Sequence, residues 1–267
     1  MKQRILTALI LAPTVLTLVF STSSIPVFIL AIICAFFGTR EVLILQDKKS
    51  LLIPGLSATA LLAAGYFLKD HYDYAYDKVI FWLSLLFFGS VFLILFFLRK
   101  EGDKRILVPG LLWVLCPLLS LVLLHYSIPK VQAVWWAPNP LLMALIPVWA
   151  GDSAAIFVGK KFGKRLLAPK ISPSKTVEGS IGYLLACVVF AYAVATSIGI
   201  TPKQGLLVGL VAGILGQAGD LFESAIKRSF HAKDSGDILP GHGGILDRID
   251  SMLMSALPIT ALILLYR

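Results

Sequence analysis

The chain has 267 residues, of which 58% are hydrophobic and only 15% are charged, with a mean hydropathy of +0.86. A soluble domain of this length carries about a quarter charged residues, so the composition excludes an ordinary soluble protein and predicts an integral membrane protein. The formal net charge of +9 fits basic loops facing anionic lipid head groups better than a nucleic-acid partner. We therefore expect contact with a lipid bilayer and none with nucleic acid.

Nine apolar segments are long enough to cross a membrane as helices, which takes about 20 mainly apolar residues each. They predict an all-α, polytopic membrane protein with spans at roughly 5–21, 25–45, 51–68, 79–98, 106–126, 139–158, 179–199, 204–226 and 250–266. The first resembles a signal peptide, but the many spans after it favour a retained helix. The second contains Arg40 and Glu41, which either lie at the membrane surface, with the helix ending near Gly38, or face the bundle interior.

Lysines and arginines are distributed unevenly between the two sets of connecting loops. With the N-terminus in the cytoplasm, 19 of the 24 basic residues fall on the cytoplasmic side and 5 on the other. Cytoplasmic loops of membrane proteins carry the excess of Lys and Arg. The count predicts a cytoplasmic N-terminus and a C-terminus on the opposite side.

The polar residues that could carry chemistry are concentrated in the second half of the chain. Residues 1–135 consist of apolar spans and short loops, which predicts a transmembrane scaffold. Residues 136–267 contain the long basic loops 159–178 and 227–249, both predicted to be cytoplasmic. We expect this C-terminal part to be the catalytic region.

The span at 204–226 ends in a polar stripe at helical spacing. The members of the stripe are Gln217, Asp220, Glu223, Ser224, Lys227, Arg228 and His231. A helix end emerging into water would explain the last members but not Asp220, which follows a long apolar run. A carboxylate below the membrane surface must be paired, protonated or bound to a metal ion. We favour an ion pair or a metal ion at Asp220.

Two acids and a glycine-rich turn open the last span. Asp247 and Asp250 are three residues apart, so they share one face of a helix. Acids near a helix N-terminus also suit the helix dipole, and Asp250 fits this simpler role better than Asp247. The turn at 241–244 lets the backbone approach a ligand closely. Its His242 is as compatible with an ordinary loop histidine as with a ligand contact.

A second polar group lies earlier in the chain. Asp152 interrupts an apolar span, so the argument made for Asp220 applies to it as well. The basic run at 160–165 is typical of a loop that touches lipid head groups. Two hydroxyls and an ammonium group directly precede a glycine-started helix, where they could help backbone N–H groups to hold a phosphate. These residues are Ser174, Lys175 and Thr176.

The motifs of several common hydrolase classes are absent from the sequence. It contains no GxSxG and no HExxH, and its four histidines are scattered. A serine triad and a zinc site of the usual kind are therefore disfavoured. Carboxylates, cations and glycine turns remain, and this combination suits phosphoryl or nucleotidyl transfer, in which positioning and charge neutralisation do most of the catalysis.

The charged region at 224–250 resembles the signature of the phosphatidate cytidylyltransferases, also called CDP-diacylglycerol synthases. Every constrained position of that signature matches, at Ser224, Ile226, Lys227, Arg228, Lys233, Asp234, Gly236, Leu239, Pro240, His242, Gly243, Gly244, Ile245, Asp247, Arg248, Ile249 and Asp250. Residues 172–176 and 178–179 are similar to a second block of that family, with Val177 where an aromatic residue is expected. These motifs cover only residues 151–250.

The resemblance implies an enzyme that transfers the CMP moiety of CTP to phosphatidic acid, giving CDP-diacylglycerol and pyrophosphate for phospholipid biosynthesis. It also implies Mg²⁺, with a second cation left open, held by Asp220 and Asp247 with Asp250 and Asp152 as further candidates. The implied catalytic residues are Asp220, Asp247, Lys227, Arg228 and Arg248. The implied substrate-binding residues are Ser174, Lys175, Thr176, Ser224, Lys233, Asp234, His242, Gly243 and Gly244.

The resemblance further implies a homodimer, and we expect a multi-pass protein of the cell's inner (cytoplasmic) membrane. Two alternatives stay open. A CTP-dependent lipid or polyprenol kinase would likewise combine CTP with a lipid, but it would transfer the γ-phosphate and release CDP. An ion-coupled transporter would use Asp152 and Asp220 as ion ligands inside the membrane.

Overall fold

A computed structural model describes residues 13–17, 20, 24–48, 50–70, 72–100, 102–126, 139–239, 241 and 243–265. Its long helices are α2 Ser24–Ile44, α3 Leu52–Asp70, α4 Tyr72–Phe97, α5 Leu107–Tyr126, α6 Leu142–Phe162, α7 Val177–Ser197, α8 Pro202–Ser229 and α9 Leu246–Leu265. A short 3₁₀ helix, Lys104–Ile106, precedes α5. Most of the predicted first span, 5–21, lies outside the described residues.

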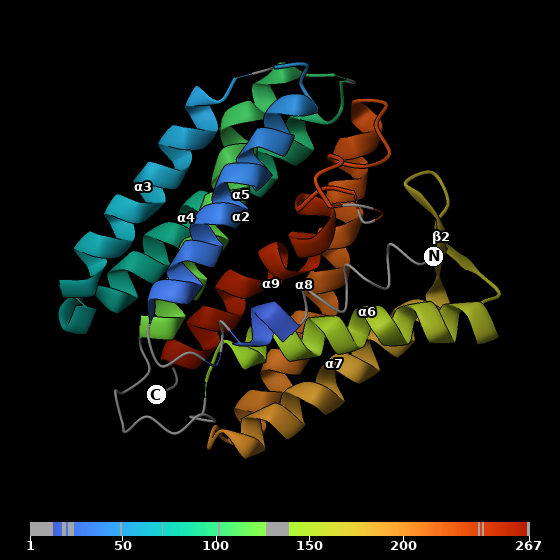
Figure 1. Cartoon of the computed structure of the whole chain (residues 1–267). Coiled ribbons are helices and arrows are strands. Elements are labelled where there is room, and N and C mark those ends of the chain that lie inside the picture. Colours follow the sequence, from blue (N-terminus) through green and yellow to red (C-terminus); the bar gives the residue numbers. More distant parts are fainter. Residues whose placement is uncertain are drawn as a thin grey trace.

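The helices form two groups that share α8 and α9 (Figure 1). Helices α2 to α5 pack together on one side, and α5 also contacts α9. Helices α6 and α7 run side by side and cross the direction of α2 and α5 steeply. Helix α8 contacts both α7 and α9, so it joins the two groups and carries the polar stripe between them.

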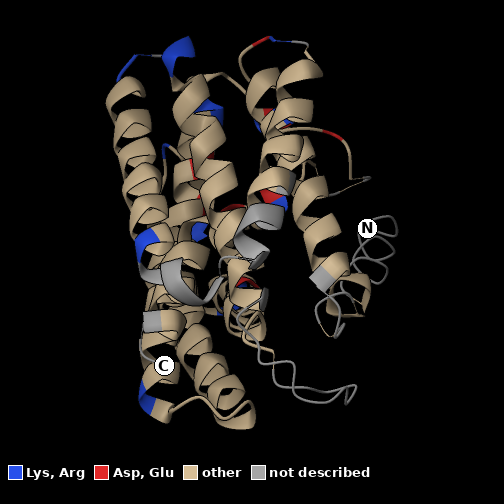
Figure 2. Ribbon diagram, turned by 90° about the vertical axis from the view of Figure 1, so that its left-hand side faces the viewer, with Lys and Arg blue, Asp and Glu red and all other residues tan. Residues whose placement is uncertain are grey.

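Six helices among the described residues are long and apolar enough to cross a membrane: α2, α4, α5, α6, α7 and α8. The predicted helical, multi-pass membrane fold is therefore confirmed, while the number of nine spans and the orientation stay predictions. Most of the ribbon carries no charge, and charged residues gather at helix ends, in loops and at a few internal positions (Figure 2). Many large apolar side chains are exposed, such as Phe92 at 68%, as lipid-facing side chains require.

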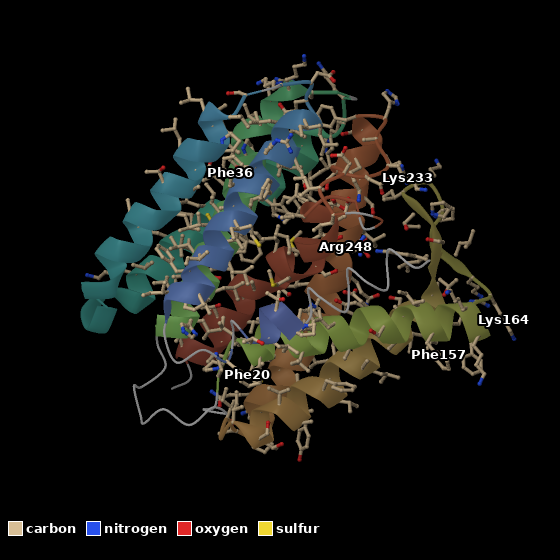
Figure 3. The ribbon with its side chains drawn as sticks, viewed as in Figure 1. Phe20, Phe36, Phe157, Lys164, Lys233 and Arg248 are labelled. Atoms are coloured by element: carbon tan, nitrogen blue, oxygen red, sulfur yellow. The ribbon has the colours of Figure 1, made fainter. Side chains whose placement is uncertain are left out.

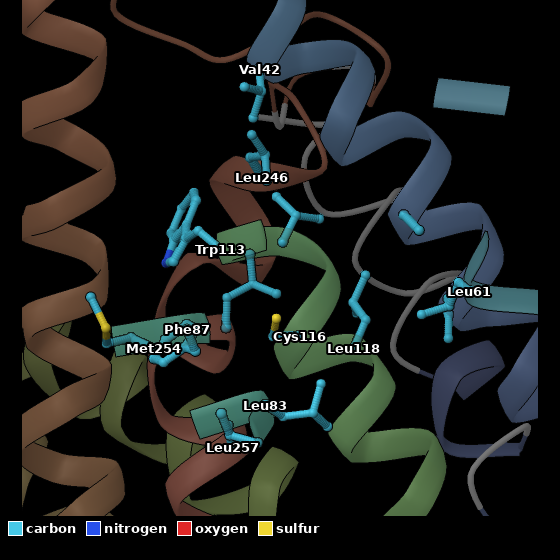
Figure 4. Close-up of a cluster of buried hydrophobic side chains, with 14 of the residues drawn as sticks. Val42, Leu61, Leu83, Phe87, Trp113, Cys116, Leu118, Leu246, Met254 and Leu257 are labelled. Atoms are coloured by element: carbon cyan, nitrogen blue, oxygen red, sulfur yellow. The ribbon is translucent and has the colours of Figure 1, made fainter. Parts of the chain in front are cut away.

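The core consists of two neighbouring clusters of buried apolar side chains. One joins α2 to α5 with α8 and α9, and Figure 4 shows part of it around Trp113, Phe87 and Met254. The Trp113 ring packs edge-on against Phe222 of α8, with the ring centroids 5.3 Å apart. The other cluster joins α6 and α7 to helices α5, α8 and α9. Close packing on both sides fixes α8 and α9, which bear the charged residues of the second half.

Two features of the fold bear on expectations from the sequence. Helix α2 continues past Gly38 to Ile44, and Glu41 is fully buried, so the acid of this span faces the bundle interior rather than the membrane surface. The predicted loop 159–178 contains an antiparallel hairpin of two short strands, β1 Leu166–Ala168 and β2 Ser172–Thr176, whereas the sequence predicted only a basic loop and an all-α fold there. The hairpin stands beyond the end of α6 (Figure 1).

Candidate functional site

A buried lysine joins two carboxylates where α8 and α9 meet. Lys227 Nζ lies 2.5 Å from Glu223 Oε2, one turn earlier on α8, and 2.6 Å from Asp247 Oδ1 in the first turn of α9. The side chains of all three residues are at most 10% exposed. Because a buried charge is costly unless it is paired, this network holds two helices in a fixed relation.

Asp247 also fixes the loop that precedes its own helix. Its carboxylate accepts hydrogen bonds from the Gly244 N–H at 2.8 Å and from the Ser235 N–H at 3.1 Å. Burial raises the pKa of Asp247, but the hydrogen bonds from Lys227 and the Gly244 N–H outweigh it and hold that pKa below its usual value. Asp247, which precedes the predicted span 250–266, is therefore a paired, ionised group.

Gly243 has the backbone conformation that this arrangement requires. Its φ of +81° is one that side chains with a Cβ rarely adopt, and an added Cβ would lie 2.6 Å from Asp247 Oδ2. The Gly243 C=O accepts a hydrogen bond from the Leu239 N–H, which closes the loop as an isolated bridge. Gly243 thus allows the backbone conformation of the loop and leaves room for the Asp247 carboxylate.

A second group of charges brings together three helices and the hairpin. Asp220 of α8 forms an ion pair with Lys175 of β2. Asp152 of α6 interacts electrostatically with Asp220, Lys175 and Arg248, and Asp250 of α9 interacts with Asp220, Asp152 and Lys175. Carboxylates that are far apart in the sequence therefore lie near enough to influence one another, and Lys175 and Arg248 offset part of their charge.

The hairpin positions Lys175 through the start of α7. Thr176 is the N-cap of α7, and its hydroxyl oxygen accepts a hydrogen bond from the Gly179 N–H at 3.1 Å. Glu178 accepts a hydrogen bond from the Lys164 N–H at 3.0 Å and joins the first turn of α7 to the chain after α6. Ser174 is exposed on β2. The segment predicted to hold phosphate is thus the end of strand β2, which leads directly into α7 with the Thr176 hydroxyl as the cap of that helix.

No group of three or more His, Cys, Asp or Glu side chains among the described residues lies close enough to hold a metal ion by itself. Asp220 is paired with Lys175, and Asp247 is paired with Lys227. Any cation would therefore need ligands beyond these carboxylates, such as phosphate oxygens of a substrate and water, which is the usual situation for Mg²⁺.

Comparison with known proteins places this arrangement in a family. The model of the cytidylyltransferase family matches residues 2–266. The chain belongs to the cytidylyltransferase family. A Bacillus subtilis protein named phosphatidate cytidylyltransferase is 35% identical over 255 residues, which cover 95% of this chain and 94% of that protein. A Staphylococcus saprophyticus protein of the same name is 30% identical over 99% of both chains, and one from Haemophilus influenzae is 47% identical over 44% of this chain and 43% of its own.

The remaining residues singled out in the sequence lie around these two groups. Arg228 is exposed and donates a hydrogen bond to the Ala232 C=O at 2.9 Å and a longer one to the Ile171 C=O of the hairpin turn. Arg248 and Lys233 lie on the side of the bundle that faces the hairpin (Figure 3). Lys233 and its neighbour Asp234 are exposed in the loop after α8. Half-buried Ser224 lies on α8, and His242 lies outside the described residues.

Two acids of this family member were not proposed as site residues from the sequence. Glu223 belonged to the polar stripe, but its partnership with Lys227 depends on burial that spacing alone does not show. Glu41 interrupts the apolar α2, and its carboxylate contacts the loop before α9. A charged residue inside an apolar span is itself a sign of a specific role. The sequence does not show, however, that the partners of Glu41 lie about 200 residues further along the chain.

Proposed function

We propose that this chain transfers the CMP moiety of CTP to phosphatidic acid, forming CDP-diacylglycerol and pyrophosphate for phospholipid biosynthesis. The similarity across 95% of the chain to a protein named phosphatidate cytidylyltransferase carries this proposal. The charged group around Asp220 and Lys175 supports it, because it supplies the kind of chemistry that the reaction needs.

The reaction joins two polyanions. A phosphate oxygen of the lipid attacks the α-phosphorus of CTP, the new P–O bond forms, and the bond to the departing pyrophosphate breaks. Because the attacking oxygen is already anionic, no serine or histidine nucleophile is required. Lys175 and Arg248 lie beside the carboxylates of Asp152 and Asp220, where they would neutralise phosphate charge and orient both substrates.

The donor chemistry of the site fits Mg²⁺, which favours oxygen ligands and commonly takes one or two carboxylates with substrate phosphates and water. We propose Asp220 and Asp247 as ligands, with Asp152 and Asp250 as further candidate ligands for this ion or for a second cation. The bound ion would polarise the α-phosphoryl group and stabilise the charge of the leaving pyrophosphate. Asp247 would have to exchange its contact with Lys227 for such a role, whereas Asp220 would exchange its contact with Lys175.

The remaining proposed site residues would hold the substrates. Lys227 and Arg228, at the end of α8, would supply further positive charge to the phosphates. The loop residues and the hairpin would close around the nucleotide, with contacts from Ser174, Lys175, Thr176, Ser224, Lys233, Asp234, His242, Gly243 and Gly244. The acyl chains would stay in the bilayer while CTP enters from water.

The topology and assembly follow as proposals of the same kind. We propose nine spans, a cytoplasmic N-terminus and a C-terminus on the other side, supported by the excess of Lys and Arg in one set of loops. We further propose that this multi-pass protein lies in the inner (cytoplasmic) membrane and acts as a homodimer, as the family resemblance implies. The orientation can be tested with Lys203→Cys and Lys161→Cys, which are predicted to lie on opposite sides of the membrane. A thiol reagent that does not cross the membrane should label only position 203 from the outside.

The position of the label in CTP tests the reaction directly. Purified protein in detergent is given phosphatidic acid, Mg²⁺ and CTP labelled at either the α- or the γ-phosphate. Transfer of CMP puts the α-label in the lipid and the γ-label in pyrophosphate. A lipid kinase would put the γ-label in the lipid and release CDP, and the absence of any lipid labelling by well-folded protein would favour the transporter.

A further inference from the structure

Glu41 connects the first group of helices to the loop that precedes α9. Its side chain lies in the last full turn of α2 and is 0% exposed. Oε1 accepts a hydrogen bond from the Ile245 N–H at 2.8 Å, and Oε2 accepts bonds from the Leu246 N–H and the Ser235 hydroxyl, each at 2.8 Å. One carboxylate therefore satisfies three donors that lie about 200 residues further along the chain.

Two of those donors are the N–H groups at the start of a helix. Leu246 is the first residue of α9, and Ile245 precedes it, so neither N–H has a partner within the helix. A side-chain oxygen at the N-cap accepts bonds from the N–H groups two or three residues further on, so even a polar residue at position 245 would leave these two N–H groups without a partner. Glu41 supplies the acceptor from another helix, and its charge also suits the positive end of the α9 dipole.

The loop makes room for this carboxylate through two glycines. A Cβ added at Gly244 would lie 2.5 Å from Glu41 Oε2, and one added at Gly236 would lie 2.9 Å from Glu41 Oε1. Real Cβ atoms do not approach other atoms so closely, so any larger residue at either position would displace the carboxylate or the loop. Gly236 and Gly244, which belong to the charged region at 224–250, thus leave room for Glu41, which lies outside that region.

Ser235 links Glu41 to Asp247. The Ser235 hydroxyl donates to Glu41, and the Ser235 N–H donates to both oxygens of Asp247, at 3.3 and 3.1 Å. The Gly244 N–H donates to Asp247 at 2.8 Å, next to the residues that donate to Glu41. The two acids therefore bind Ser235 together and adjacent N–H groups at 244–246, so displacement of Glu41 would free the segment that orients Asp247.

We propose that Glu41 is a positioning residue for the reaction: it fixes Ser235, the segment 243–246 and the start of α9, so that Asp247 keeps its place beside Lys227, and Arg248 meets the substrate phosphates in a set geometry. This inference rests on the proposed cytidylyl transfer. It assigns to α2 a role in the chemistry that is separate from its packing in the core. A carboxylate is required because three donors converge on its two oxygens.

The test combines amide hydrogen exchange with kinetics for Glu41→Gln, an isosteric change that replaces one acceptor oxygen by a donor. The matched control is Asp47→Asn, the same chemical change at an exposed position three residues beyond α2. We expect amide protection at 243–250 to fall about tenfold in Glu41→Gln, as loss of a charge-assisted hydrogen bond requires. The control and the α4 core should exchange as in the wild type.

In turnover assays, we expect kcat of Glu41→Gln to fall about 10- to 100-fold, because small displacements of reacting groups are costly. KM for CTP should rise as well, because the loop that Glu41 holds also carries Asp234, Gly243 and Gly244, which are proposed to contact the substrates. Ser235→Ala, which removes one of the three donors, should show a smaller change of the same kind. Glu41→Ala should be more severe than Glu41→Gln, which keeps one acceptor.

Unchanged exchange at 243–250 in Glu41→Gln would overturn the inference whatever the activity. Increased exchange with a wild-type kcat would also overturn it, because the loop would then be held by Glu41 without effect on the reaction. If the wild type forms no CDP-diacylglycerol, the proposed function fails on its own, and the inference, which concerns that reaction, fails with it. The exchange result would then show whether the structural contact survives.

Discussion

Replacement of Lys227 by methionine removes the cation that two buried carboxylates share. Lys227 Nζ lies 2.5 Å from Glu223 and 2.6 Å from Asp247, and the three side chains are 10%, 3% and 6% exposed. Removal of one partner from a buried ion pair lowers the free energy of unfolding by about 3–5 kcal/mol, because the other charge is left buried without a partner. Lys227→Met keeps most of the apolar stem, so the loss is electrostatic rather than steric.

A loss of that size should be large in a thermal unfolding assay. With about 2–4 °C per kcal/mol for a chain of this size, the apparent melting temperature in detergent should fall on the order of 10 °C. The control is Lys203→Met, which removes an exposed lysine from the start of the same helix and should change the midpoint by little. Size-exclusion chromatography after heating gives both midpoints.

A compensating variant separates charge from packing. Glu223→Gln combined with Lys227→Met removes one buried negative charge together with the positive one, and it should recover a large part of the lost stability. If Lys227→Met melts together with Lys203→Met, or if the double variant is less stable than Lys227→Met alone, the buried network does not hold α8 and α9 as described.

Three further changes test the packing and the charged group. Trp113→Ala should cost about 3–5 kcal/mol, because it opens a cavity against Phe222, whereas Trp82→Ala at a 59% exposed position should cost far less; heating curves compare them. Gly151→Ala would place a Cβ 2.7 Å from a buried sulfur and should lower the melting midpoint by the equivalent of about 1–3 kcal/mol, with the open Gly89→Ala as its control. Lys175→Ala should reduce the rate of lipid-dependent pyrophosphate release about 100-fold while the protein stays folded by chromatography; a wild-type rate would remove Lys175 from the site.

The apolar helices were predictable because their lengths and hydropathy are read residue by residue. The spans predicted at 25–45 and 106–126 agree with α2 and α5 to within a residue. The span at 204–226 marks only the apolar part of α8, which continues to Ser229 through charged residues that a hydropathy count excludes and that the polar stripe assigned to the same helix. The contact of Lys227 with Asp247 of α9 helps to keep this polar end of α8 helical.

The charged residues were predictable as a set but not as pairs. Asp220 was expected to carry an ion pair or a metal ion, and its partner is Lys175 of the hairpin. The capping role considered for Asp250 belongs more to Asp247, whose carboxylate accepts the Gly244 N–H. Which acid meets which cation depends on the packing of helices that are distant in sequence, and spacing along one helix carries no information on it.

The contribution of Glu41 shows the limit of a division by composition. The prediction of a scaffold at 1–135 and a catalytic region at 136–267 rests on where charged residues are dense. A single buried acid in an apolar span is easily overlooked by such a count, yet Glu41 accepts three hydrogen bonds from the loop before α9. The division stays a prediction, with this contact crossing it.

The most direct test is lipid-dependent pyrophosphate release by the wild type, Asp220→Asn and Asp47→Asn. The release is measured with phosphatidic acid, CTP and Mg²⁺, at a temperature well below the melting midpoints of all three proteins. We expect equal rates for the wild type and Asp47→Asn, and a loss of about 100-fold or more for Asp220→Asn, because Asp220 interacts with Asp152, Asp250 and Lys175 at the centre of the proposed site. A wild-type rate in Asp220→Asn would contradict the placement of the reaction at this group of carboxylates.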